Sequence, residues 1–208
     1  MQSFFYHVLS SSKTYTNVLA ELDKAVAAGE IPAKGNISFA QAQNLQYFQA
    51  ALKEAMRVRP AVGVNITRYA PPEGAELEGQ FFPGGTRVSV NGWVLHRNKQ
   101  IFGRDADDFR AERWLADEQQ ARVMERYMFQ VGFLLIYLLP GLTTHVQFGG
   151  GSHLCIGRNL ALLEINKVIP RILRDYHFEL AHPDRPLTAH ASFFVVQEGL
   201  TVYISKRK

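Results

Sequence analysis

The chain has 208 residues, of which 47% are hydrophobic and 20% are charged, and its formal net charge is +4. These proportions are typical of a globular protein with a packed core, and so diffuse a charge excludes a basic nucleic-acid-binding tract. A single cysteine excludes an internal disulfide framework, and neither a secretory signal, an internal repeat nor a low-complexity segment is visible.

The first part of the chain is predicted to be helical. Apolar residues recur at helical spacing over residues 4–9 and 14–28, and Gly29 ends the second of these segments. Ser38 is typical of a residue that opens a short helical turn. A further helix is predicted over residues 44–57.

After this helix the pattern changes to that of strands. Residues 64–69 alternate between apolar and polar, and residues 77–82 are predicted to pair with 87–90 across a turn at Pro83-Gly84-Gly85. A short helix is predicted over residues 91–96, followed by irregular chain.

The last part of the chain combines one helix with strands. Apolar residues return to helical spacing from Arg158 onwards. Residues 177–205 then predict a small antiparallel sheet with a turn near Glu198-Gly199. The sequence therefore predicts an α+β fold that is mainly helical, with small antiparallel sheets.

Cys155 stands in the glycine-rich segment Phe148-Gly-Gly-Gly-Ser-His-Leu-Cys155-Ile-Gly157, directly before a predicted helix. The glycines let a flat ligand approach the backbone, and amide groups at a helix start stabilise a thiolate. Zinc and iron-sulfur sites need several clustered ligands, whereas a single thiolate suits haem iron. The alternative, a buried unreactive cysteine, is the commoner fate of a lone thiol, but this context favours a ligand.

Glu54 and Arg57 are three residues apart, so they share a face of the helix predicted over residues 44–57 and can pair. Alone, such a pair is usually a solvated surface bridge that contributes less than about 1 kcal/mol.

Three segments together resemble the cytochrome P-450 family. The cysteine segment matches that family's haem-binding signature at Phe148, Gly151, His153, Cys155, Gly157 and Ala161. Glu54 and Arg57 resemble the Glu-x-x-Arg element of its helix K. Residues 109–114 resemble its Phe-x-Pro-Glu-Arg-Trp segment, with Ala111 in place of the usual proline, which removes stiffness but no charge.

The resemblance implies a role for each matching residue. Cys155 would be the axial ligand of the haem iron, with Phe148 beside its sulfur, and Gly151, Gly157 and Ala161 complete the signature. His153 and Arg68 would meet the haem propionates, although Arg68 reads equally well as a surface strand residue. Arg113 would join Glu54 and Arg57 in a buried triad. The substrate cavity would be lined by Val62, Val64, Asn65, Phe194 and Val195.

The family also implies a chemistry and a setting. Its members are haem-thiolate monooxygenases that insert one atom of dioxygen into an organic substrate, here an apolar one, with electrons from NADPH delivered by a flavin-containing reductase. The resemblance is to fungal, pisatin-demethylase-like members. A complete protein of this kind would lie on the cytoplasmic face of the endoplasmic reticulum membrane through an N-terminal anchor.

The resemblance covers the family's C-terminal half, from helix J onwards. Residues 1–208 are therefore expected to form a partial domain without the anchor, most of the substrate pocket and the oxygen-activating helix I, so no catalytic residue is assigned. The alternative is a truncated or misspliced product that is inactive and at most a weak haem binder.

Residues 131–147 interrupt a stretch that is continuous in the family. Their apolar part is far shorter than the roughly 20 residues needed to cross a bilayer, and Pro140 ends it. Two alternatives remain: the segment is a loop that dips into the membrane, or the whole chain is a fragment that interacts with a membrane surface. We favour a retained intron, because the ends of the segment can be encoded by splice signals and its deletion restores a family-like sequence.

Overall fold

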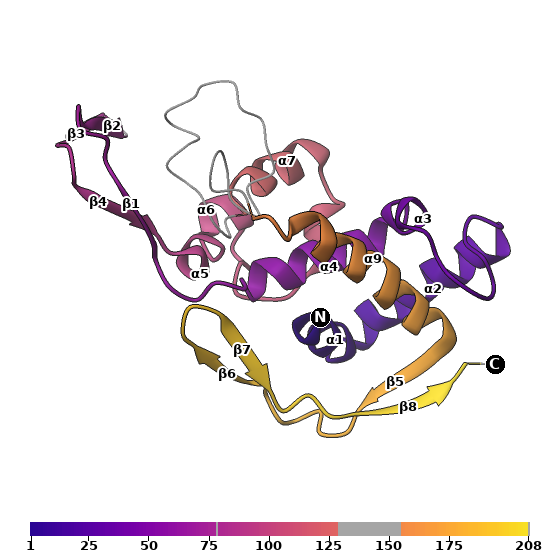
Figure 1. Cartoon of the computed structure of the whole chain (residues 1–208). Coiled ribbons are helices and arrows are strands. Elements are labelled where there is room, and N and C mark those ends of the chain that lie inside the picture. Colours follow the sequence, from indigo (N-terminus) through magenta and orange to yellow (C-terminus); the bar gives the residue numbers. More distant parts are fainter. Residues whose placement is uncertain (78, 129–154, 208) are drawn as a thin grey trace.

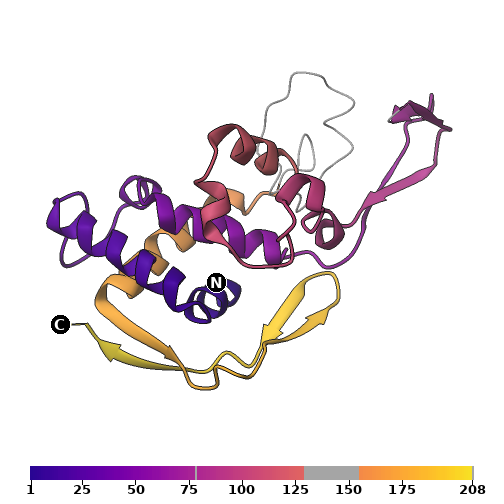
Figure 2. The same ribbon diagram turned by 180° about the vertical axis from the view of Figure 1, so that it is seen from behind.

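The computed structural model describes residues 1–77, 79–128 and 155–207. Helices gather at its centre, a β-structure projects from one side, and a long β-ribbon runs past another (Figures 1 and 2). The helices are α1 (Gln2–Leu9), α2 (Ser12–Ala27), α3 (Phe39–Gln43), α4 (Gln46–Val58), α5 (Gly92–Leu95), α6 (Lys99–Phe102), the 3-10 helix η1 (Ala111–Trp114), α7 (Glu118–Arg126) and α9 (Arg158–Asp175). The strands are β1 (Ile66–Tyr69), β2 (Ala75–Leu77), β3 (Gln80–Phe82), β4 (Arg87–Val90), β5 (Tyr176–Leu180), β6 (Thr188–Ala191), β7 (Val195–Glu198) and β8 (Val202–Lys206). This composition confirms the predicted α+β class.

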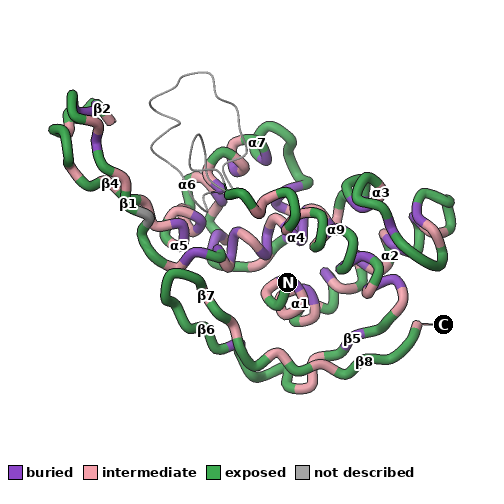
Figure 3. The backbone as a smooth tube through the Cα atoms, viewed as in Figure 1, coloured by how far each residue is buried: buried purple, intermediate pink, exposed green. Residues whose placement is uncertain are grey.

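The core lies where α1, α2, α4 and α9 meet, and buried positions concentrate there (Figure 3). Each helix buries apolar residues at helical spacing, among them Phe4, Val8, Val18, Leu22, Phe48, Leu52, Ile169 and Leu173. The rings of Phe4 and Phe48 meet edge to face, with centroids 5.6 Å apart. Truncating a buried aromatic of this kind typically costs about 3–5 kcal/mol.

The starts of α3 and α4 are fixed by side chains. Ser38 opens α3 as predicted, in a reciprocal capping box with Gln41. α4 begins close to the predicted residue 44, but its cap comes from α2. The carboxylate of Glu21 accepts hydrogen bonds from the backbone N–H groups of Tyr47 at 2.7 Å and Phe48 at 2.9 Å. α2 therefore determines where α4 begins.

The pairing of the first strands differs from the prediction. β4 pairs with β1, and β3 pairs with β2, so the predicted pairing of residues 77–82 with 87–90 is wrong. The turn at residues 83–85 instead returns the chain to Ala70, whose N–H donates to the Thr86 carbonyl at 2.8 Å. Glycine and proline specify a turn, but they do not specify which strand follows as partner.

The C-terminal strands form one long antiparallel ribbon, as predicted for residues 177–205. β5 pairs with β8, and β6 pairs with β7. The ribbon reverses at residues 192–194, where the Ser192 N–H donates to the Phe194 carbonyl at 3.1 Å. The turn predicted at Glu198-Gly199 is wrong, because the chain reverses at residues 192–194 and Glu198-Gly199 instead link β7 to β8. Gly199 has φ +95° there, a backbone region that favours glycine.

Arg207 ties the end of this ribbon to the helices. Its guanidinium donates to both carboxylate oxygens of Asp23 on α2, at 2.8 and 2.7 Å. It also donates to the carbonyl oxygen of Leu173 in the last turn of α9, at 3.1 Å. A basic side chain at a helix C-terminus stabilises the unpaired carbonyls there.

The chain between the two β-structures is more regular than predicted. The short helix predicted over residues 91–96 is α5, capped by the Asn91 side chain. The segment predicted as irregular contains the short helices α6 and η1. Across the described ranges, no helix combines the length and the apolar character that crossing a bilayer requires.

Candidate functional site

Cys155 is exposed and stands two residues before Gly157, the residue that caps α9. The Cys155 carbonyl accepts a hydrogen bond from the Arg158 N–H at 3.2 Å, and the Gly157 carbonyl accepts one from the Ala161 N–H at 2.9 Å. The helix predicted from Arg158 onwards is therefore present. Its first turn follows directly on the cysteine, where unpaired N–H groups favour an anion.

The remainder of the glycine-rich segment, with Phe148, Gly151 and His153, lies outside the described residues, as does the segment 131–147. Ala161 is half-buried on the first turn of α9. The predicted roles of these residues stay predictions.

Arg68 lies on β1, opposite Val88 of β4. Its side chain is half-buried and donates to the carbonyl of its neighbour Thr67 at 2.9 Å. This contact fits a surface strand residue, and the predicted contact with a haem propionate stays a prediction.

The two segments predicted to line a substrate cavity lie side by side, although about 130 residues separate them in the chain. Val62 and Phe194 form an antiparallel bridge. Gly63 donates to the Phe193 carbonyl at 3.2 Å, and Val195 donates to the Ala61 carbonyl at 2.9 Å. The sequence gives no signal for this contact, which joins the β6–β7 hairpin to residues 61–63, just after α4.

Exposure differs among the predicted lining residues. Val62 is buried and Val195 is half-buried, whereas Val64, Asn65 and Phe194 are exposed. The two segments joined at Val62 and Phe194 therefore present an apolar surface around Phe194, and main-chain hydrogen bonds hold them together.

Glu54, Arg57 and Arg113 form one buried cluster, as predicted for a triad. Their side chains are 0%, 0% and 2% exposed. Arg57 contacts both carboxylate oxygens of Glu54, at 2.8 and 2.9 Å, in a bidentate pair. Arg113 Nε donates to Glu54 Oε1 at 2.9 Å. The contacts and burial exclude the solvated surface bridge.

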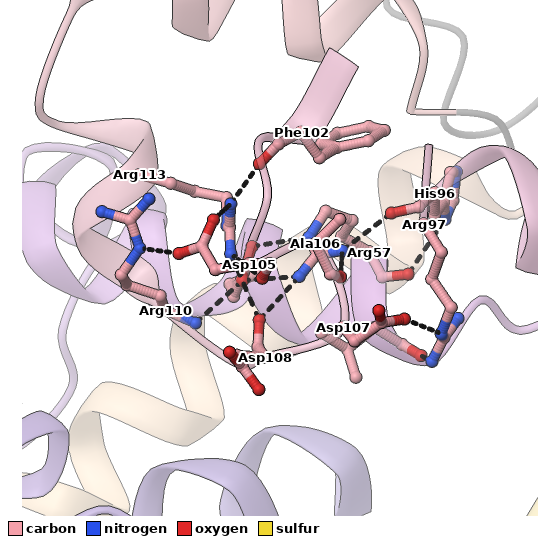
Figure 4. A network of polar contacts seen from close by, with 12 residues as sticks. Arg57, His96, Arg97, Phe102, Asp105, Ala106, Asp107, Asp108, Arg110 and Arg113 are labelled. Carbon is pink, nitrogen blue, oxygen red and sulfur yellow. Dashed lines mark hydrogen bonds and ion pairs between the residues drawn. The ribbon is translucent and has the colours of Figure 1, made fainter. Parts of the chain in front are cut away.

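Both guanidinium groups also bind main-chain carbonyls of the segment before η1 (Figure 4). Arg57 donates to the carbonyls of His96, Ala106 and Asp108. With its two bonds to Glu54, all five of its N–H groups have acceptors.

Arg113 is satisfied in the same way. Its remaining N–H groups donate to the carbonyls of Phe102, Asp105 and Asp108 and to the Asp105 carboxylate. No donor of either arginine is left without an acceptor, which is what makes burial of two cations tolerable.

Two further groups donate hydrogen bonds to the Glu54 carboxylate, and the sequence did not predict either of them. The indole Nε1–H of Trp114 donates to Glu54 Oε2 at 2.9 Å, and the backbone N–H of Arg110 donates to Oε1 at 2.9 Å. The role of Trp114 could have been predicted from its position directly after Arg113. The backbone donor has no sequence signal, because every residue except proline carries one.

Burial by itself raises the pKa of the Glu54 carboxyl, but hydrogen bonds from Arg57 and the charges of Arg57 and Arg113 hold that pKa below its usual value. Burial also opposes ionisation of Asp105, whose pKa is lowered by Arg110 and Arg113. Both carboxylates are therefore ionised near neutral pH, and they balance the charges of Arg57 and Arg113.

Within the described ranges, no group of three or more His, Cys, Asp or Glu side chains could hold a bare metal ion. Cys155 can supply one exposed sulfur in front of a helix start. A single thiolate fits a metal that brings its other ligands with it, as haem iron brings four pyrrole nitrogens.

Comparison with known proteins places these features in one family. The model of the family described as cytochrome P-450 matches residues 1–203. Pisatin demethylase of Fusarium vanettenii is 37% identical over 198 residues, which are 95% of this chain and 34% of that protein. The cytochrome P-450 monooxygenase ACRTS1 of Alternaria alternata is 32% identical over 100% of this chain and 50% of that protein. The monooxygenase cicH of Emericella nidulans is 31% identical, over 100% of this chain and 38% of that protein. The chain thus spans between a third and a half of the length of these relatives.

Proposed function

We propose, from the premise that the chain belongs to the cytochrome P-450 family, that it forms the thiolate-bearing part of a haem monooxygenase in which Cys155 is the axial ligand of the iron. The observation that carries this proposal is the position of Cys155, an exposed thiol that leads directly into the first turn of α9. The N–H groups at that helix start favour the thiolate over the thiol.

Bound haem with a thiolate ligand would supply the activation of dioxygen, because the sulfur donates electron density that favours cleavage of the O–O bond. The residues of this chain have the tasks of holding and orienting that sulfur. The buried cluster of Glu54, Arg57 and Arg113 supports this role by fixing α4 against the segment before η1.

The remaining assignments follow from the same premise. Arg68 and His153 would meet the haem propionates, with Phe148 beside the sulfur and Gly151, Gly157 and Ala161 shaping the loop around it. We propose an apolar organic substrate, because the segments joined at Val62 and Phe194 are mostly apolar.

The partners belong to the proposal too. Electrons would come from NADPH through a flavin-containing reductase, as the family's chemistry requires. The whole protein would work at the cytoplasmic face of the endoplasmic reticulum membrane.

The test is to add haemin to the 208-residue chain, reduce it, and record its spectrum under carbon monoxide. Thiolate ligation predicts a strongly red-shifted Soret band in the unaltered chain and its loss in Cys155→Ser. A red-shifted band that survives in Cys155→Ser would contradict the assignment. A folded chain that takes up no haem would favour the inactive product instead.

A further inference from the structure

The helix that follows Cys155 is weakly held along its first half. Residues 158–165 of α9 are exposed or half-buried, and the buried positions of the helix begin at Asn166. Ile169, Pro170, Leu173 and Arg174 complete the buried set. Packing of apolar side chains therefore secures the second half of α9, whereas the first half has the half-buried Ile165 against the core and, next to it, the polar contacts of Asn166.

Asn166 is 0% exposed, and its amide joins three helices. Its Oδ1 accepts hydrogen bonds from Gln43 Nε2 at the end of α3, at 2.9 Å, and from Gln49 Nε2 on α4, at 2.6 Å. Its Nδ2 donates to the Leu162 carbonyl, one turn earlier on α9, at 2.8 Å. Gln49 also donates to the Ala42 carbonyl at 2.9 Å. We call Asn166, Gln43 and Gln49 the amide cluster.

Pro170 makes this cluster more important to α9. Proline has no N–H, so the Asn166 carbonyl receives no helical hydrogen bond from residue 170. The backbone of α9 is thus weakened at the boundary between its two halves, and proline is the usual site of a helix kink. The hydrogen bonds of the amide cluster lie at that same boundary.

The cluster reaches the helix that carries the buried charge network. Gln49 stands on α4, five residues before Glu54. Hydrogen bonds are directional, so they fix the rotation of α9 about its axis and its position along that axis relative to α4. Apolar contact alone would leave both adjustable.

We infer that Asn166 is a positioning residue for Cys155. Asn166 holds the first half of α9 at one rotation and one axial position relative to α4. It thereby also holds Cys155, which directly precedes the helix. The part of this inference that concerns iron ligation rests on the proposed function.

The first experiment measures hydrogen exchange in the 208-residue chain without haem. Asn166→Leu removes both the acceptor shared by Gln43 and Gln49 and the donor to the Leu162 carbonyl, so amide exchange over residues 158–165 is expected to rise about tenfold or more. Exchange in α4 stays unchanged. Asn159→Leu is the matched control, because Asn159 is an exposed asparagine on the same helix, and it leaves exchange unchanged.

Two milder variants guard against a failure of Asn166→Leu to fold. Gln43→Leu removes one donor at an exposed position and predicts a smaller rise over residues 158–165. Asn166→Asp keeps the acceptor for Gln43 and Gln49 but loses the donor to the Leu162 carbonyl, so it retains only part of the protection. Unchanged exchange in both Asn166→Leu and Gln43→Leu would overturn the inference.

The second experiment adds haemin and measures the share of the reduced carbon monoxide complex in the red-shifted Soret band. Asn166→Leu lowers that share at least threefold, Asn159→Leu leaves it unchanged, and Asn166→Asp gives a share between those of Asn166→Leu and the unaltered chain. An unaltered share in Asn166→Leu, despite faster exchange, would show that the cluster holds the helix without positioning the cysteine. If the unaltered chain lacks the band, or Cys155→Ser keeps it, the proposed function fails, and the exchange measurement still decides whether Asn166 holds the helix.

Discussion

The imidazole of His7 lies flat against the ring of Phe109, with ring centroids 5.0 Å apart and planes 3° from parallel. This stack joins α1 to the segment that enters η1. Among the described residues, Nε2 of His7 is buried without a hydrogen-bond partner. Burial, followed by the nearby charge of Arg59, lowers the pKa of His7 to about 4, so the ring is neutral in the folded protein.

The first prediction concerns pH. The folded pKa of His7 lies below its ordinary value of 6.5, so the unfolded chain binds a proton more readily, and stability falls as the pH drops from about 6.5 towards about 4. Between pH 8 and pH 5 this loss amounts to about 2 kcal/mol. His7→Phe keeps the stack and should remove most of that dependence in urea unfolding. His182→Gln, at an exposed histidine, should retain it, and equal pH dependence in both variants would contradict the prediction.

The second prediction concerns the buried charges. Glu54→Ala leaves Arg57 and Arg113 buried without their carboxylate, which should lower the free energy of unfolding by about 3–5 kcal/mol and reduce haem uptake. Glu118→Ala removes an exposed ion pair with Arg122 and should change stability by less than about 0.5 kcal/mol. Denaturant titration compares the two. Similar small effects would mean that the cluster contributes no more than a surface bridge.

The third prediction concerns the contact between residues 61–63 and the β6–β7 hairpin. A Cβ atom on Gly63 would lie 2.8 Å from Val195 Cγ2 and 3.2 Å from Ala191 Cβ. Gly63→Val should therefore separate the segments, cost about 1–3 kcal/mol, and speed exchange of the Val195 amide. Ala189→Val, at an exposed position of β6, is the control. Unchanged exchange at Val195 in Gly63→Val would disprove the close contact.

The fourth prediction concerns residues 131–147, which lie outside the described part of the chain. If they are a retained intron, transcript sequencing should find messages without them, and protein lacking them should hold haem more tightly in titrations with haemin. A long insertion in a genuine loop costs little entropy, so in that case its deletion would leave haem affinity unchanged. Transcripts that all contain the segment, together with unchanged haem affinity after its deletion, would identify it as a genuine loop.

The sequence predicted what local spacing encodes. Glu54 and Arg57 share a helix face because they are three residues apart, and the resemblance supplied Arg113 as their partner. Spacing cannot supply the carbonyl acceptors of Ala106 and Asp108, since every residue carries a carbonyl group. Nor does a glutamine pattern reveal that Gln43 and Gln49 converge on Asn166, because this depends on how three helices pack.

The errors in the fold have similar causes. A turn at residues 83–85 was predicted correctly, but the choice of β1 as the partner of β4 depends on Ala70, which lies before β2 and β3. The helix α6 has only four residues, too few for a periodic pattern to emerge. Contacts such as that between Val62 and Phe194 join distant segments, for which a single sequence holds no local signal.

The acceptors used by Arg57 and Arg113 also determine which changes the segment before η1 can tolerate. The two arginines bind carbonyl oxygens of Phe102, Ala106 and Asp108, so replacing those side chains leaves the acceptors in place. Mutational tolerance should therefore be high at exposed positions such as Asp108 and limited chiefly by backbone conformation. In a saturation library, proline would be depleted at the exposed residues 107 and 108 more strongly than any change of side-chain charge.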